Sequence, residues 1–186
     1  MRLFVAVEIP DHAKERLEEV VAELRACRAD VRWIPTASMH VTLKFLGNVE
    51  PREVAAIDGA SRRVAADAAP IAARLRTLGS FPHLRRPRVV WAGVDAGNES
   101  LHELQEALDR SLSALGFGRE KRRFHAHVTI GRVNSQRGVV ELAAAIEGRA
   151  DLDLGPVDIE ALTLFESKLR RSGAEHTPLG VYPLGG

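Results

Sequence analysis

The stretch HVTLKF at residues 40–45 indicates the architecture, because a similar stretch, HVTIGR, occurs at residues 127–132. Each copy has the order His-Val-Thr followed by an aliphatic residue. Successive side chains of a β-strand face opposite sides of a sheet, so the histidine and the threonine of each copy share one face while the aliphatic residues face a core. Each copy is therefore predicted to be a strand that presents an imidazole beside a hydroxyl group.

Two such copies would arise by chance in well under about one chain in a hundred of this composition. The plain alternative is that both strands are half-buried and that their polar side chains simply face solvent. If both strands converge on one cleft, His40 and His127 can serve as acid and base, because an imidazole pKa near ~6.5 allows either role at neutral pH. Thr42 and Thr129 can donate hydrogen bonds to the non-bridging oxygens of a phosphate. This set suits hydrolysis of a phosphodiester and calls for no metal and no other cofactor.

The paired motifs resemble the two signature motifs of the two-histidine (2H) phosphoesterases. Other segments are similar to the branch of RNA 2′,3′-cyclic phosphodiesterases, which are also called 2′-5′ RNA ligases. These segments are RLFVAVEIP, VRWIP before the first motif, LGSFP, PRVVWAGV and LTLFESKL. They follow one another in family order along nearly the whole chain, so the resemblance is highly specific.

The resemblance implies an α+β fold with two pseudo-symmetric lobes, in which two antiparallel sheets face a central cleft and the helices lie outside. Residues 1–186 would then form a single domain. His40 and His127 would be the catalytic pair, and Thr42 and Thr129 would bind the phosphate. The expected reaction is hydrolysis of an RNA 2′,3′-cyclic phosphate end to a 2′-phosphate, and it allows reverse 2′-5′ ligation.

Within this resemblance we assign His40 as the acid that protonates O3′ and His127 as the base that activates water. The two motifs are nearly interchangeable, so the residues alone do not fix this order. The resemblance also implies that Phe45 and Arg132 sandwich the terminal nucleobase, as stacking on a single-stranded end allows. Strict alternation would instead turn both side chains toward the core, so a strand end or a bulge has to redirect them.

The rest of the chain reads as a mixture of strands and helices with largely antiparallel pairing. Strands are predicted at residues 2–9, 31–34, 39–47, 71–81, 88–94, 124–132, 157–169 and 175–184, with a turn at Ser172-Gly173. Helices are predicted at residues 11–25, 51–66, 99–116 and 139–146.

Composition limits the classes of partner. The net charge is +1, so no strong overall field attracts long nucleic acid, although a site needs only local charge. Cys27 is the single cysteine, which excludes an internal disulfide and points to the cytoplasm. The first ten residues lack the apolar region of a signal peptide, and no stretch approaches the about 20 apolar residues of a membrane span. We expect a cytoplasmic monomer whose partners are RNA ends or small nucleotides.

Two sets of residues leave alternatives open. His125 and His127 share a strand face, and with His40 they could supply three imidazoles to a zinc ion. Arginine and lysine cluster at residues 85–88 and again at residues 119–123, either as a basic rim that steers an RNA end or as ordinary solvated loop charge.

Two positions depart from the family pattern. His176 stands where relatives commonly have Tyr, which puts any ribose or phosphate contact of that residue in doubt. Ala126 stands where relatives often have Pro. Within the same chemistry, the rival function is a phosphodiesterase for a small cyclic nucleotide. The rival from another class is a non-catalytic nucleotide- or RNA-binding module that uses the same cleft.

Overall fold

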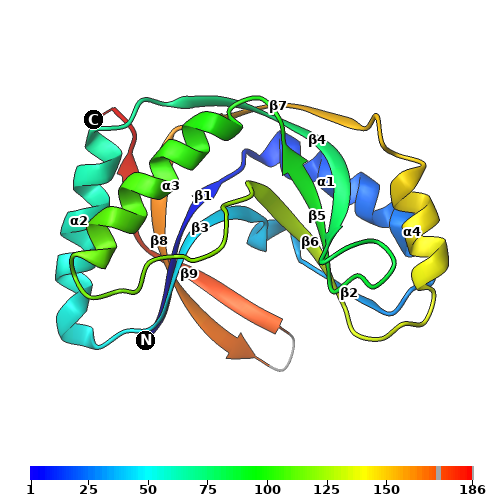
Figure 1. The fold of residues 1–186 in the computed structure, drawn as a ribbon, viewed down its shortest axis with the longest axis horizontal. Coiled ribbons are helices and arrows are strands. Elements are labelled where there is room, and N and C mark those ends of the chain that lie inside the picture. Colours follow the sequence, from blue (N-terminus) through cyan, green and yellow to red (C-terminus); the bar gives the residue numbers. More distant parts are fainter. Residues whose placement is uncertain (171–172, 186) are drawn as a thin grey trace.

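The computed structural model describes residues 1–170 and 173–185, and in this part of the chain it has four α-helices and a nine-stranded sheet (Figure 1). The strands are β1 (Arg2–Glu8), β2 (Val31–Trp33), β3 (His40–Asn48), β4 (Ile71–Phe81), β5 (Val89–Val94), β6 (His127–Val133), β7 (Asp153–Ile159), β8 (Ala161–Arg170) and β9 (Gly173–Pro183). The helices are α1 (Asp11–Arg25), α2 (Val54–Ala66), α3 (Asn98–Ser113) and α4 (Val139–Glu147), and short 3₁₀ turns lie at Thr36–Ser38 and Pro51–Glu53.

The helices form where the sequence has apolar residues at helical spacing. In α1 the buried side chains include Leu17, Val21 and Leu24, which recur every three to four residues and therefore lie along one face. Helix α3 buries four leucines at the same kind of spacing, Leu101, Leu104, Leu108 and Leu112. These faces pack on the sheet and join one large apolar cluster that includes residues of both halves of the chain.

All strand pairs are antiparallel, and the order along the sheet is β7-β4-β5-β6-β3-β1-β8-β9, with β2 paired to β6. The middle of this order is a narrow seam, because the described part of β3 pairs with β6 at one position, Val41 opposite Val128. The strands β7, β4, β5 and β6, with β2 paired to β6, lie on one side of the seam, and β3, β1, β8 and β9 lie on the other. The two predicted sheets are therefore present and are continuous at this point. The α+β fold with two lobes is confirmed.

The two lobes exchange helices. Helix α1 follows β1 but packs against β7 and α4 in the other lobe, and α3 follows β5 but packs against α2 and β3. In Figure 1, α2 and α3 accordingly lie together on one side and α1 and α4 on the other. The units β1-α1-β3 and β5-α3-β6 therefore correspond, and each delivers one His-Val-Thr strand to the seam.

One predicted strand was wrong. Residues 157–169 were expected to form one strand, but the chain leaves β7 at Ile159 and enters β8 at Ala161. The two strands lie in different lobes, with β7 beside β4 and β8 beside β1. Glu160 is exposed between them, and its carbonyl accepts a hydrogen bond from the Leu184 amide at 2.8 Å. The turn expected at Ser172-Gly173 includes Ser172, which lies outside the described residues.

None of the helices within residues 1–170 and 173–185 is long and apolar enough to cross a membrane. The assignment of residues 1–186 to a single domain stays a prediction.

Candidate active site

The seam between β3 and β6 brings the two motifs together. On either side of the Val41–Val128 pair, the antiparallel register sets His40 across from Thr129 and Thr42 across from His127. Both valines are buried, whereas all four polar side chains are half-buried on the opposite face of the sheet. A group bound over the seam would therefore meet one imidazole and one hydroxyl from each strand.

Each motif strand contains a β-bulge at the same place. In β3 the register against β1 skips Leu43, and in β6 the register against β5 skips Ile130, which in both cases is the third residue after the histidine. The skipped residue reverses the alternation beyond it. Phe45 and Arg132 consequently turn to the cleft side, where both are exposed, Phe45 by 65%. The bulge that strict alternation required is thus present in both strands.

His40 lies in an aromatic wall. Phe4 stacks on its ring with 5.0 Å between centroids, Phe165 lies at 5.9 Å, and His176 meets it edge-on at 5.4 Å. Burial lowers the pKa of His40 to about 4, and the charge of His176 acts in the same direction, while a hydrogen bond with the Ser38 backbone opposes the shift. His40 is therefore neutral in the free protein at neutral pH.

His127 has a matching environment in the other lobe. Its Nδ1 lies 2.7 Å from the His125 carbonyl oxygen, which can only accept, so Nδ1 carries the proton and Nε2 keeps its lone pair. Phe81 meets the ring edge-on at 5.0 Å, and Trp91 lies at 6.4 Å. Burial lowers the pKa of His127, the His125 hydrogen bond acts against this shift, and the charges of His125 and Arg132 add to it.

The aromatic walls were not predicted as part of the site. Phe4 and Phe165 flank His40, and Phe81 and Trp91 flank His127. Each of these four rings comes from one of the segments that carry the family resemblance, RLFVAVEIP, LTLFESKL, LGSFP and PRVVWAGV. The four segments were recognised in the sequence. Placing their rings beside the histidines also requires knowing which strands flank the motif strands, and strand order is not a local property.

The two threonines are free to bind a ligand. Within the described residues, no hydrogen bond to protein engages the hydroxyl of Thr42 or Thr129. Both hydroxyls can therefore donate to an anion over the seam. An imidazole beside a hydroxyl on each strand can move one proton on each side of a bound phosphate.

The structure does not support the zinc alternative. The described residues contain no group of three or more His, Cys, Asp or Glu side chains placed to hold a metal ion, so the three imidazoles of that alternative do not gather around one point. Phe45 and Arg132 do not stack on each other in the described structure. The cation–π contact found there joins a different pair, Arg62 and Tyr182. A base held by both would have to lie between them.

Comparison with known proteins agrees with this geometry. A family profile described as the 2′-5′ RNA ligase superfamily matches residues 9–171. The RNA 2′,3′-cyclic phosphodiesterase of Methanocaldococcus jannaschii is 32% identical over 173 residues, which is 93% of this chain and 95% of that protein.

Two solved structures have the same fold over the whole chain. The protein TT0787 of Thermus thermophilus has a TM-score of 0.83 and 28% identity, covering 100% of this chain and 99% of that one. E. coli LigT, in a complex with NADP⁺, has a TM-score of 0.77 and 26% identity, covering 100% of this chain and 98% of that one. With its two His-Val-Thr strands meeting at the seam, the chain belongs to the 2′-5′ RNA ligase superfamily, the 2H phosphoesterases.

Proposed function

We propose that this protein hydrolyses the 2′,3′-cyclic phosphate at an RNA end to a 2′-phosphate, with His40 and His127 as its acid–base pair and without a metal. The observation that carries the proposal is the register of the seam, which sets His40 across from Thr129 and Thr42 across from His127 on one face. The related M. jannaschii protein bears the name RNA 2′,3′-cyclic phosphodiesterase, in keeping with this activity.

The reaction needs one proton removed and one proton delivered. His127 Nε2 accepts a proton from water, the water oxygen bonds to phosphorus, the P–O3′ bond breaks, and His40 gives a proton to O3′. Thr42 and Thr129 donate hydrogen bonds to the non-bridging oxygens, whose charge grows in the transition state. Each proton transfer contributes about 10²- to 10⁴-fold to the rate. A 5′-hydroxyl in place of water would give a 2′-5′ linkage by the same steps.

The lowered pKa values tie protonation to substrate binding. In the free protein the pKa of His40 is about 4, and that of His127 is also below its ordinary value. At neutral pH, little of the protonated imidazole that the reaction needs as its acid is therefore present before substrate binds. A cyclic phosphate is an anion, and an anion beside an imidazole raises the imidazole pKa. Binding of the substrate therefore favours protonation of His40, which then donates this proton to O3′.

The test is turnover of a short RNA with a 2′,3′-cyclic phosphate end, in the presence of EDTA, with separation of 2′- and 3′-phosphate products. Wild type should form the 2′-phosphate, and His40→Ala and His127→Ala should each lose at least about 10²-fold in kcat. His12→Ala, which changes an exposed histidine, is the matched control. Turnover that EDTA abolishes would sink the proposal. Binding without turnover would favour the binding module, and turnover of mononucleotides alone would favour the small-nucleotide phosphodiesterase.

The order of acid and base has its own test. Replacing O3′ by sulfur gives a leaving thiolate whose conjugate acid has a pKa near ~8.5, so departure no longer requires a proton. If His40 is the acid, this substrate should restore turnover to His40→Ala and leave His127→Ala inactive. Rescue of His127→Ala instead would reverse the two roles.

We also propose that Phe45 and Arg132 hold the terminal nucleobase, since both are exposed on the cleft side beyond the bulges. The physiological form that we propose is a cytoplasmic monomer. The single Cys27 fits a reducing compartment.

A further inference from the structure

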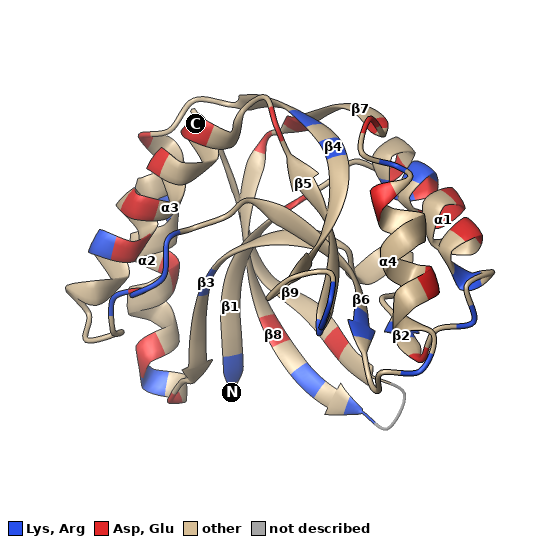
Figure 2. Cartoon of the chain, turned by 45° about the vertical axis from the view of Figure 1, so that its right-hand side comes forward, with Lys and Arg blue, Asp and Glu red and all other residues tan. Residues whose placement is uncertain are grey.

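The loop that joins α3 to β6 concentrates positive charge beside the active site. Residues 119–123 read Arg-Glu-Lys-Arg-Arg, which is four cations and one carboxylate, in a protein whose net charge is +1. We call residues 117–126 the basic loop. In Figure 1 it runs in light green from the end of α3 to β6, and Figure 2 shows blue along much of it. The loop leads directly into His127, the first residue of β6, so its charges lie within a few residues of the catalytic strand.

The one carboxylate of the basic loop is engaged with the backbone. A Glu120 side-chain oxygen accepts the amide hydrogens of Lys121 at 2.9 Å and Arg122 at 3.1 Å. Lys121, Arg122 and Arg123 are all exposed, and within the described residues none of them lies in an ion pair. These cations are thus available to an external anion.

A buried ion pair holds the loop from beneath. Asp109 of α3 is 4% exposed and binds the Lys44 ammonium, the Arg119 Nε at 3.3 Å and the Glu120 amide at 3.1 Å. Lys44 is 5% exposed and also donates to the Gly118 carbonyl. Burying two charges is unfavourable unless both are well bonded, so this arrangement fixes the shape of the loop.

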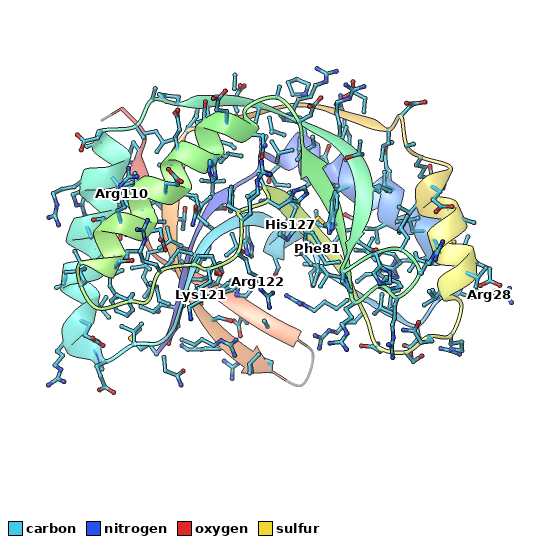
Figure 3. The ribbon with its side chains drawn as sticks, viewed as in Figure 1. Arg28, Phe81, Arg110, Lys121, Arg122 and His127 are labelled. Atoms are coloured by element: carbon cyan, nitrogen blue, oxygen red, sulfur yellow. The ribbon has the colours of Figure 1, made fainter. Side chains whose placement is uncertain are left out.

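The anchor belongs to the active-site strand. Lys44 follows the bulge residue of β3 and precedes Phe45, so the strand that presents His40 also fixes the loop. At the other end Ala126 is 1% exposed, and its carbonyl accepts the Val94 amide at 3.2 Å. Figure 3 shows Lys121 and Arg122 near the middle of the molecule, toward His127, whereas Arg28 and Arg110 lie at the outside.

We propose that the basic loop binds the phosphodiester backbone of the RNA strand just 5′ of the cyclic end, so that the enzyme prefers an RNA chain to a mononucleotide. This inference rests on the proposed function. Long cationic side chains on a fixed backbone suit phosphates, and the two phenylalanines of the loop, Phe117 and Phe124, pack against the apolar core rather than standing free to stack on a base. The contacts should therefore be independent of base sequence.

The test compares two substrates, an RNA oligomer with a 2′,3′-cyclic phosphate end and a nucleoside 2′,3′-cyclic monophosphate. For Lys121→Gln/Arg122→Gln we expect kcat/KM on the oligomer to fall about three- to tenfold at low salt, as for two exposed ion pairs. On the mononucleotide kcat/KM should stay within about twofold of wild type. The slope of log kcat/KM against log salt should become flatter by about 1.4 on the oligomer, because about 0.7 is lost per contact with a single strand.

The matched control is Arg28→Gln/Arg110→Gln, which removes two exposed charges away from the site and should leave both substrates unaffected. Equal losses on both substrates, an equal loss in the control, or a wild type without preference for the oligomer would each overturn the inference and leave the proposed function standing. A wild type that turns over neither substrate would instead overturn the proposed function. The loop would then be tested by fluorescence anisotropy of a labelled oligomer ending in a 2′-phosphate, with the same variants and the same criteria.

Discussion

Removing the ammonium of Lys44 should destabilise the protein by about 3 kcal/mol. Breaking a buried pair by removing one partner costs about 3–5 kcal/mol, because the other charge stays buried without compensation. The lower end applies here, since Arg119 and the Glu120 amide still bond to Asp109. Lys44→Met keeps the length of the side chain and removes its charge. A domain stable by about 5–15 kcal/mol should survive the loss, so the variant can be measured.

The assay is urea denaturation of a double-mutant cycle made of wild type, Lys44→Met, Asp109→Leu and the double variant. The double variant replaces both charges by apolar groups, so it should be more stable than the sum of the two single losses predicts, by about 2 kcal/mol. A coupling below about 0.5 kcal/mol would refute the reasoning, as would a Lys44→Met variant that loses less than about 1 kcal/mol. Either result would mean that water reaches the pair.

The pH dependence of this pair follows from the same contacts. Burial acts to raise the pKa of Asp109, but hydrogen bonds from Lys44, the Glu120 amide and Arg119 outweigh it, so the pKa lies below its usual value. A carboxyl whose pKa is lower in the folded state stabilises the protein at neutral pH, and this contribution is lost as the pH falls through the lowered pKa. The coupling in the double-mutant cycle should accordingly persist at mildly acidic pH.

Other consequences can be measured directly. The pKa of His40 is about 4 in the folded protein and near ~6.5 in an unfolded chain, so lowering the pH from about 7.5 to about 5 should remove about 2 kcal/mol of stability through His40 alone. In urea denaturation, His40→Phe should therefore lose about 2 kcal/mol less than wild type over the same pH range. Gly79→Ala would place a Cβ 2.3 Å from the Trp91 ring, so it should cost about 1–3 kcal/mol and change the tryptophan fluorescence, whereas Gly59→Ala within α2 should be neutral or stabilising. His176→Gln removes a neighbouring charge, so the His40 pKa titrated by NMR should rise. The alkaline limb of kcat/KM should lie at lower pH than that of kcat, because the bound phosphate raises both imidazole pKa values.

The parts of the fold that could be predicted are those that depend on local patterns of the amino-acid sequence. The four predicted helices were located from local signals such as the apolar spacing within residues 11–25 and Pro51 at the start of the second helix. The alternation in the two motifs identified the faces of His40 and His127. The break at Glu160 could not be predicted, because both sides of it continue the alternation of a strand and only the order of strands in the sheet separates them. For the same reason the aromatic walls escaped prediction, since they depend on which strands flank β3 and β6.

The matched bulges explain why the likeness of the two motifs extends beyond the histidine and threonine. Residues 40–45 and 127–132 have the same order of half-buried, buried and exposed positions, although their last two residues differ in kind. The bulge turns the fifth residue after each histidine toward the cleft and the fourth toward the core. In β3 the fourth residue is Lys44, which anchors the basic loop through Asp109. In β6 it is Gly131, where a Cβ would lie 2.7 Å from Val31 and 3.0 Å from Trp33.

A shared backbone shape thus serves two different purposes at its inner position, an ion pair in one lobe and close packing of β2 in the other. At the outer position it exposes an aromatic ring in one lobe and a guanidinium in the other. The proposed acid–base pair would account for the repeated His-Val-Thr. The repeated bulge has a separate cause, because without it Phe45 and Arg132 would point into the core, where an unpaired guanidinium is not tolerated. The repeated His-Val-Thr and the repeated bulge are therefore independent features of one strand geometry. A change that removed either bulge would leave the imidazoles in place and would turn away from the cleft a side chain proposed to hold the base.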